Sequence, residues 1–389
     1  MTKILHQVGH NYKWNLDSYF ENEIGDGFIF TSYSIEKDKI NNDISGYSAE
    51  KYMPVSMLDL QFYGSKKSKG GKLDTYSFHP IKFLEDDATQ LSTKNSIFEA
   101  IKFQEEQGFK KIIIPVIYKE TSGTDDLIDV IKYVNLKLKK KDGLEYYMTL
   151  PLSHSLVQDD DNLEKVLLNI TDLKISFDGF FVTDEVLMKS NQKVNIDYTR
   201  YENLLKVFRV LNKEDFSIIY GYANWDVLIF LSLVNLDYVT IGTYENLRKF
   251  CIERFTEDIG GGKSDGWYFS EKLLNCIRSS ELVPIRRAGA IDLIKNEKNI
   301  FSDVILEEGY SWNIHRPDVQ KNYLLAVNNI IRELTAEKDI KKRALLMLQK
   351  TEGAIETYKK LEGKRVYLTE ANSGYHLSFW QSFLKSKIN

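Results

Sequence analysis

Apolar and polar positions alternate along the middle of the chain in a way that predicts strands and helices following one another. Short apolar runs predict three strands, at Asp178–Glu185, Ser217–Ala223 and Asp237–Thr243. Between them, apolar residues spaced three and four apart predict helices at Thr199–Leu211 and Trp225–Val234. Strands that alternate with amphipathic helices are typical of a parallel sheet with helices packed outside it.

The same alternation extends toward the N-terminus. A continuous apolar run at Ile112–Ile117 is typical of a strand buried on both faces, and a further strand is predicted at Glu145–Leu152. Helices are predicted at Asp125–Lys139 and Leu163–Leu173, and one more before Gly108. Capping boxes are read at the starts of two helices, in the pairs Ser96 with Glu99 and Thr199 with Glu202.

The strands near positions 110, 145, 178 and 217 recur at roughly the 30–40 residues of one strand–helix unit. Weaker strand candidates at Ile4, Phe28 and Val304–Leu306 bring the number to eight. Eight parallel strands are the number that closes a barrel. The sequence therefore predicts an α/β fold with a TIM-barrel-like (β/α)₈ domain, and an open doubly wound α/β sheet is the alternative.

The predicted barrel occupies residues 1–316 and contains an irregular insertion at about 35–90. That insertion includes a loop rich in glycine and lysine between Gly64 and Lys72, which is either a cover over the site or disordered. The pattern of residues 317–389 predicts helices with hardly a strand among them. This part of the chain is therefore predicted to be a helical C-terminal appendage, and it contains many lysines. Leu345, Leu346 and Leu348 lie too close together for all three to face one core, which leaves a protein interface open.

The amino-acid composition limits the expected partners and location of the protein more than it limits the reaction at its site. The formal net charge of −4 does not indicate nucleic acid as a partner, although a local basic face leaves room for one. No apolar run reaches the roughly 18–20 residues of a membrane helix, so no membrane partner is expected. With only two cysteines, Cys251 and Cys276, the chain is no disulfide scaffold, and a cytoplasmic location is expected.

Polar and aromatic side chains follow three successive predicted strands. The carboxyl ends of parallel strands meet at one edge of the sheet, where barrel enzymes hold their chemistry. Asp184 or Glu185 and Glu245 are the candidate catalytic carboxylates, and Arg248 is the candidate anion anchor. Tyr222, Asn224 and Trp225 are the candidate substrate-binding residues. Each also has a structural alternative: Asn224 suits a helix N-cap, Glu245 a first helical turn, and Arg248 a pair with Glu245.

Histidines supply further candidates. His154 follows a predicted strand and is a candidate acid or base, while His6 and His10 end the first strand and are candidate substrate ligands. No spacing among these residues requires a metal, and no metal ligand is assigned. The string Gly260–Ser264 lacks the earlier glycine and the flanking strand and helix of a phosphate-binding loop, so it is interpreted as a plain loop.

Two functions remain open at this point. The first is an enzyme that cleaves or transfers at a glycosidic or N-glycosidic bond of a sugar-, nucleoside- or nucleotide-type substrate, for which two carboxylates are the minimum. The second is a non-catalytic barrel that works as a binding or assembly subunit, in a protein or nucleic-acid-associated complex, through its basic helical tail. The cofactor, the substrate and the oligomeric state are not determined by the sequence.

Overall fold

Eight parallel strands form a single sheet in the computed structural model, which describes residues 1–63, 72–80, 90–118, 123–171, 175–187, 192–256 and 266–388. The strands are β1 (Lys3–Val8), β2 (Gly27–Thr31), β3 (Ser56–Asp59), β4 (Lys111–Ile114), β5 (Glu145–Leu152), β6 (Gly179–Asp184), β7 (Ser217–Tyr220) and β8 (Tyr238–Gly242). The predictions for 64–71 and for Gly260–Ser264 lie outside the described residues.

The sheet is nearly closed into a barrel. Its strand order is β3-β2-β1-β8-β7-β6-β5-β4, so the first strand pairs with the eighth, and all strands that are consecutive along the chain pair with each other except β3 and β4. Beyond the ends of β3 and β4, Tyr63 and Tyr118 form one parallel bridge across the remaining gap. The predicted TIM-barrel fold is thus confirmed, and the strand order is not that of an open doubly wound sheet.

One of the eight predicted strands is wrong. Val304 and Ile305, predicted as the last strand, lie at the end of helix α12 (Ile300–Ile305). The missing strand is β3, inside the segment predicted as an irregular insertion. Its four residues contain only two large apolar side chains, which is too short a pattern to distinguish from a loop.

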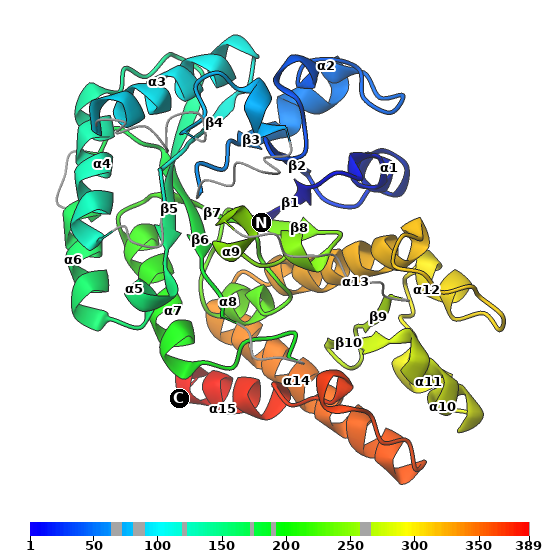
Figure 1. The fold of residues 1–389 in the computed structure, drawn as a ribbon. Helices are drawn as coiled ribbons and strands as arrows, with labels where there is room; N and C mark the ends of the chain where they lie inside the picture. Colours follow the sequence, from blue (N-terminus) through cyan, green and yellow to red (C-terminus); the bar gives the residue numbers. More distant parts are fainter. Residues whose placement is uncertain are drawn as a thin grey trace.

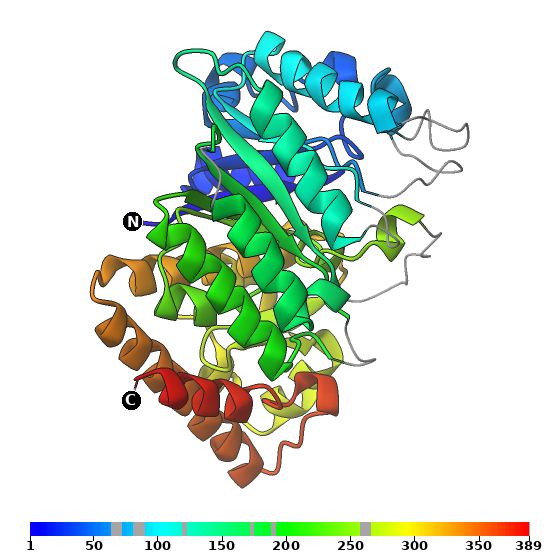
Figure 2. The ribbon, with the colours of Figure 1, turned by 90° about the vertical axis from the view of Figure 1, so that its left-hand side faces the viewer.

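Five of the helices that follow the strands lie close to their predicted positions: α3 (Gln90–Glu106), α4 (Thr124–Lys137), α6 (Asp160–Thr171), α7 (Tyr198–Lys213) and α8 (Val227–Leu233). The structure adds α1 (Tyr12–Asn22) and the short α5 (His154–Val157). Figure 1 shows them around the outside of the strands, and Figure 2 shows α4, α6 and α7 side by side.

The predicted capping boxes are wrong. Ser96 lies within α3 rather than at its start. The N-cap of α7 is Asp197, two residues before the predicted Thr199, and its carboxylate accepts a hydrogen bond from the backbone N–H of Arg200 at 3.1 Å. Carboxylates are as good as hydroxyls at this position, so residue type alone did not decide between them.

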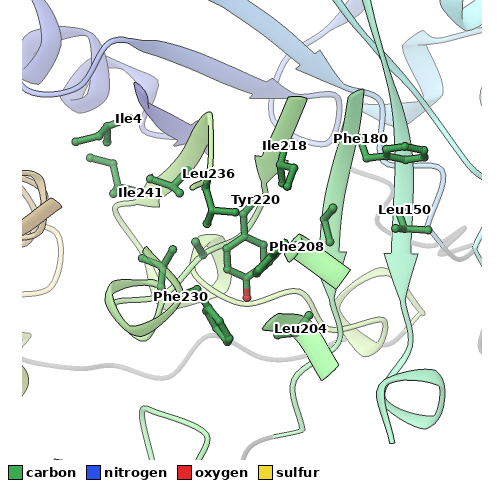
Figure 3. Close-up of a cluster of buried hydrophobic side chains, with 14 of the residues drawn as sticks. Ile4, Leu150, Phe180, Leu204, Phe208, Ile218, Tyr220, Phe230, Leu236 and Ile241 are labelled. Carbon is green, nitrogen blue, oxygen red and sulfur yellow. The ribbon is translucent and has the colours of Figure 1, made fainter. Parts of the chain in front are cut away.

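The main core lies between the strands and the surrounding helices. Ile218 and Tyr220 of β7 point outward, and Leu204 and Phe208 of α7 and Phe230 of α8 pack near them (Figure 3). The centre of the Tyr220 ring lies 5.2 Å from the centre of the Phe208 ring. A tyrosine in this layer must find a partner for its hydroxyl group, which the site below supplies.

After β8 the chain leaves the barrel and then returns to it. It first forms short helices and a hairpin: α9 (Glu253–Thr256), β9 (Trp267–Ser270), β10 (Asn275–Arg278), α10 (Leu282–Arg287), α11 (Ile291–Ile294) and α12. Helix α13 (Pro317–Ala336) then packs against β8, α1 and α8, where a barrel helix would lie. The predicted division of the chain at residue 316 remains a prediction, and α13 lies with the barrel.

The last two helices, α14 (Ile340–Gly363) and α15 (Leu377–Ile388), pack against each other and on α8. Trp380 is fully buried there, and its indole N–H donates to the hydroxyl of Tyr201 at 3.0 Å. Of the three leucines that suggested an interface, only Leu345 is exposed, at 41%, whereas the other two pack against the core. A protein partner for this tail remains a prediction. Among the described residues, none of the helices combines the length and the apolar character that a membrane crossing requires.

Strand β6 can approach β7 closely because residue 179 is glycine. A Cβ atom built on Gly179 would stand 1.9 Å from the carbonyl oxygen of Ser217. We expect Gly179→Ala to lower the free energy of unfolding by about 3 kcal/mol, because backbone atoms of two paired strands must separate. Urea unfolding followed by circular dichroism measures this.

Gly353 provides the matched control. It lies in α14 with no atom within 4 Å of a built Cβ. Gly353→Ala should raise the free energy of unfolding by about 1 kcal/mol, because alanine is the better helix former. Equal effects of the two alanines would contradict the strand packing described here.

Candidate functional site

A cavity that is partly open to solvent lies at the carboxyl ends of β6, β7 and β8. Six of the ten residues predicted for the site line it: Asp184, Tyr222, Asn224, Trp225, Glu245 and Arg248. The hairpin β9–β10 adds Trp267 and Cys276, and the loop before α7 adds Lys193. The predicted meeting of these three strand ends is therefore seen, and the loops after β8 provide the far wall.

Arg200 is the centre of the buried wall. Its Nε donates to Asp184 Oδ2 at 2.6 Å, and its Nη1 donates to Asp226 Oδ2 at 2.9 Å. The hydroxyl of Tyr220 donates to the other oxygen of Asp184 at 2.6 Å. All four side chains are at most 3% exposed. Asp184 therefore uses both oxygens within the protein, whereas Asp226 Oδ1 has no partner.

This cluster shifts the ionisation of its members. Burial acts to lower the pKa of Arg200, but the charges of Asp184 and Asp226 outweigh it and raise that pKa above its ordinary value. Burial raises the pKa of Asp226, and the charge of Asp184 adds to the shift, although Arg200 opposes it. One guanidinium faces two carboxylates, so a proton is more easily kept on the one with a free oxygen.

Glu245 lies on the outer side of the same cavity. Its Oε2 accepts a hydrogen bond from Lys193 Nζ at 2.5 Å, and that ammonium group stands 4.4 Å from the ring centre of Trp267. Burial alone would raise the pKa of Glu245, but the charge and hydrogen bond of Lys193 lower it below its ordinary value. Glu245 starts a short 3₁₀ turn, Glu245–Leu247, rather than the expected α-helix.

The C-terminal part of the chain holds the loop that carries Lys193. The backbone N–H groups of Lys193 and Val194 donate to the hydroxyl of Tyr375 at 2.7 and 2.8 Å. Asn224 Nδ2 donates to the carbonyl oxygen of Lys193 at 2.7 Å. Asn224 thus bridges two loops and does not cap α8, whose N-cap residue is Asp226.

Glu185 points away from this cavity, toward the mouth of the barrel. Successive side chains of a strand face opposite sides, so Asp184 faces the helices and Glu185 the interior. The Oε2 atom of Glu185 accepts from the backbone N–H of His154 at 3.1 Å and from the hydroxyl of Tyr118 at 3.4 Å. Asp184 and Glu185 therefore bind different parts of the structure, as the alternation of side chains along a strand predicts.

Tyr222 connects the cavity with the barrel interior. Its hydroxyl donates to Asp59 Oδ2 at 2.7 Å and accepts from Gln61 Nε2 at 2.6 Å. Both Tyr222 and Gln61 have φ of +52°, a backbone conformation that costs free energy in residues other than glycine. Asp59 ends β3 and is buried inside the barrel.

The three candidate histidines are not among the residues that line the cavity. His154 opens α5, and its backbone N–H serves Glu185. His6 is fully buried between β1 and α1, with its Nε2 at 2.7 Å from the carbonyl oxygen of Ile24, and burial lowers its pKa to about 4. His10 lies in the following loop, its ring 5.6 Å from that of Tyr33.

The sequence offered little signal for three of the site residues. Arg200 lies inside a helix, 16 and 26 positions from the two carboxylates that it joins. Lys193 is one lysine among many in loops. Asp226 was easier to find from the sequence, because it ends the polar run after β7 that includes Tyr222 and Asn224.

Among the described residues, the side chains around this cavity form neither a metal site nor a reactive thiolate. Across the described ranges of the chain, no three side chains of the histidine, cysteine, aspartate or glutamate type are grouped to hold a metal ion. Cys276 lines the cavity, but burial raises its pKa to about 11, which keeps it a thiol.

No protein-family model and no curated protein matches the chain. Among solved structures, dihydrodipicolinate synthase from Oceanobacillus iheyensis is 10% identical, with a TM-score of 0.35 over 99% of this chain and 95% of that one. A monomeric dihydrodipicolinate synthase variant is also 10% identical, with a TM-score of 0.33 over 85% of this chain and 97% of that one. Similarities this slight carry no argument about chemistry, and the barrel is established here by its strand order.

Removing the cation of the buried wall should be costly. We expect Arg200→Met to lower the free energy of unfolding by about 3–5 kcal/mol, because two buried carboxylates lose their partner. Arg209→Met, at an exposed position of the same helix, should change it by less than about 0.5 kcal/mol. Asp226→Asn added to Arg200→Met should recover part of the loss. Similar effects of the two arginine substitutions in urea unfolding would show that Arg200 is not the centre of the wall.

Proposed function

We propose that the chain is an enzyme that cleaves or transfers at a glycosidic or N-glycosidic bond, with Asp226 as the general acid and Glu245 as the base or nucleophile. The proposal rests on the different environments of two carboxyl groups that line one cavity: Asp226 is buried with one oxygen free, and Glu245 is paired with Lys193. These environments shift the pKa of Asp226 upward and that of Glu245 downward. Two acidic groups whose environments separate their pKa values are suited to give and to take a proton at the same pH.

The assignment keeps Glu245 from the sequence-based one and replaces its partner. Asp184 or Glu185 was the expected partner of Glu245, but both oxygens of Asp184 are engaged by Arg200 and Tyr220, and Glu185 is not among the residues that line the cavity. Asp226 has the free oxygen and shares the same arginine. In this proposal Asp184 is a positioning residue, which fixes the guanidinium that in turn fixes Asp226.

The proposed chemistry follows from these contacts. Neutral Asp226 gives its proton to the leaving group, and the carboxylate that remains is stabilised by Arg200 at 2.9 Å. Glu245, kept ionised by Lys193, attacks the anomeric carbon or removes a proton from water. Trp267 supplies a flat aromatic wall of the kind on which a sugar or base packs.

Glycosidic and N-glycosidic bonds are the class favoured here because their cleavage uses this pair of groups and nothing more. Protonation of the leaving group by one carboxyl group and attack assisted by a second one complete the reaction without a further electrophile. The rest of the cavity supplies an aromatic surface and hydrogen-bonding groups, which are suited to bind a polar ring.

Substitution of the two carboxylates tests the proposal. Asp226→Asn and Glu245→Gln should each lower kcat at least about 100-fold on a cleaved nitrophenyl glycoside or nucleoside, because each removes a proton-transfer group. Thermal midpoints should change little for Asp226→Asn, since an amide oxygen can still accept from Arg200. Glu185→Gln, which alters a buried carboxylate outside the cavity, should leave kcat within about twofold.

The pH profile gives a second readout of the same variants. Activity requires Glu245 ionised and Asp226 protonated, so it should fall on the acid side through Glu245 and on the alkaline side through Asp226. Residual activity of Asp226→Asn should lose the alkaline limb. An unchanged profile in that variant, or a larger loss in Glu185→Gln than in either of the two, would contradict the assignment.

A further inference from the structure

Three hydrogen-bond donors beside the cavity have no partner in the protein. They are the indole N–H of Trp225, the Nε–H of Arg248 and the hydroxyl of Tyr323. Trp225 is 2% exposed and Tyr323 3% exposed, so neither donor is satisfied by bulk water. Unpaired buried donors are expensive, and natural proteins keep few of them without a reason.

The side chains that carry the three donors pack near one another although they come from different parts of the chain. The guanidinium carbon of Arg248 stands 4.0 Å from the ring centre of Tyr323 on α13. The ring of Trp225, after β7, is centred 6.2 Å from that of Tyr323. A second cavity is lined by Arg248 and Tyr323 and shares Glu245, Arg248, Trp267 and Cys276 with the first. Arg248 therefore lies on the wall common to both.

The acidic residues of the site are already paired with other cations. Asp184 and Asp226 bind Arg200, and Glu245 binds Lys193. Across the part of the chain that the structure describes, Arg248 has no ion pair of its own; it stacks on Tyr323 instead. Its positive charge is thus available to a ligand, together with two neutral donors.

We propose that Arg248, Trp225 and Tyr323 form an oxyanion subsite, which binds a phosphoryl or carboxylate group. Arginine and tryptophan can only donate hydrogen bonds, so the group that they bind must be an acceptor, and the charge of arginine favours an anion. Insofar as this group belongs to the substrate, the inference rests on the proposed function. The substrate is then an acidic glycoside, a sugar phosphate or a nucleotide rather than a neutral sugar.

The free acceptors of the cavity fit such a ligand. Asn224 Oδ1 and Asp226 Oδ1 also lack partners, and they belong to the same loop as Trp225. A site that combines free donors with free acceptors suits a molecule that carries an anionic group and hydroxyl groups. The bond to be cleaved would then lie near Asp226 while the anion is held by Arg248.

Trp225 reports directly on this subsite. The chain has five tryptophans, so the indole N–H signals of the full-length ¹⁵N-labelled protein are few, and Trp225→Phe assigns the one of interest. Inorganic phosphate and acetate are titrated separately, with the ionic strength held constant by chloride. We expect the Trp225 signal to move in a saturable way with at least one of them, and the effective anion tells a phosphoryl from a carboxylate subsite.

Two variants and two controls locate the binding. Arg248→Met should raise the Kd at least tenfold, and Tyr323→Phe, which removes only the hydroxyl, should raise it severalfold. Arg316→Gln removes an exposed cation, and Tyr310→Phe removes another unpartnered hydroxyl that lines neither cavity, so both should leave the Kd unchanged. If Trp225→Phe fails to fold, calorimetric titration of the same two variants and controls gives the same comparison.

The outcomes separate this inference from the proposed function. No saturable shift with either anion, or a Kd unaffected by both Arg248→Met and Tyr323→Phe, overturns the subsite. Binding that depends on Arg248 and Tyr323 supports it even if Asp226→Asn and Glu245→Gln leave turnover intact, in which case only the proposed chemistry fails. Conversely, activity that depends on the two carboxylates without anion binding leaves the chemistry standing and removes the subsite.

Discussion

The position of Arg200 between two buried carboxylates is the constraint on which the site depends. A guanidinium group and two carboxylates are expensive to remove from water, and they are tolerated only where hydrogen bonds satisfy them. Asp184 ends β6, Arg200 comes from α7, and Asp226 precedes α8, so the cluster ties two strand–helix units together. It also leaves one carboxylate oxygen, Asp226 Oδ1, without a partner. The same contacts thus hold the two strand–helix units together and position the ionisable carboxyl group of Asp226.

The parts of the chain beyond the barrel complete this cavity rather than standing apart from it. The hairpin β9–β10 supplies Trp267 to this cavity, helix α13 supplies Tyr323 to the second cavity beside it, and the loop before α15 supplies Tyr375, which contacts the loop of Lys193. Tyr375 holds the loop of Lys193, and Lys193 in turn lowers the pKa of Glu245. A site built from segments this far apart in sequence depends on the packing of α13 to α15 on the barrel.

Much of the fold was predictable from the sequence, because strands buried on both faces and amphipathic helices leave clear periods, as at Glu145–Leu152. The short strand β3 shows no such period in the sequence. The strand-end rule placed Glu245, Arg248 and the loop after β7 correctly at one cavity. It did not distinguish Asp184 from Asp226, because their difference lies in which oxygens Arg200 and Tyr220 occupy. Such pairings are set by tertiary structure, and local sequence carries no record of them.

The central claim is that one cavity holds two carboxyl groups with oppositely shifted pKa values, and carboxyl ¹³C chemical shifts measured against pH test it most directly. Labelling of aspartate and glutamate, with Asp226→Asn and Glu245→Gln to assign the two signals, gives both titrations in the full-length protein. We expect Asp226 to titrate above the ordinary range of aspartate and Glu245 below that of glutamate. A Glu245 that titrates above Asp226 would contradict it.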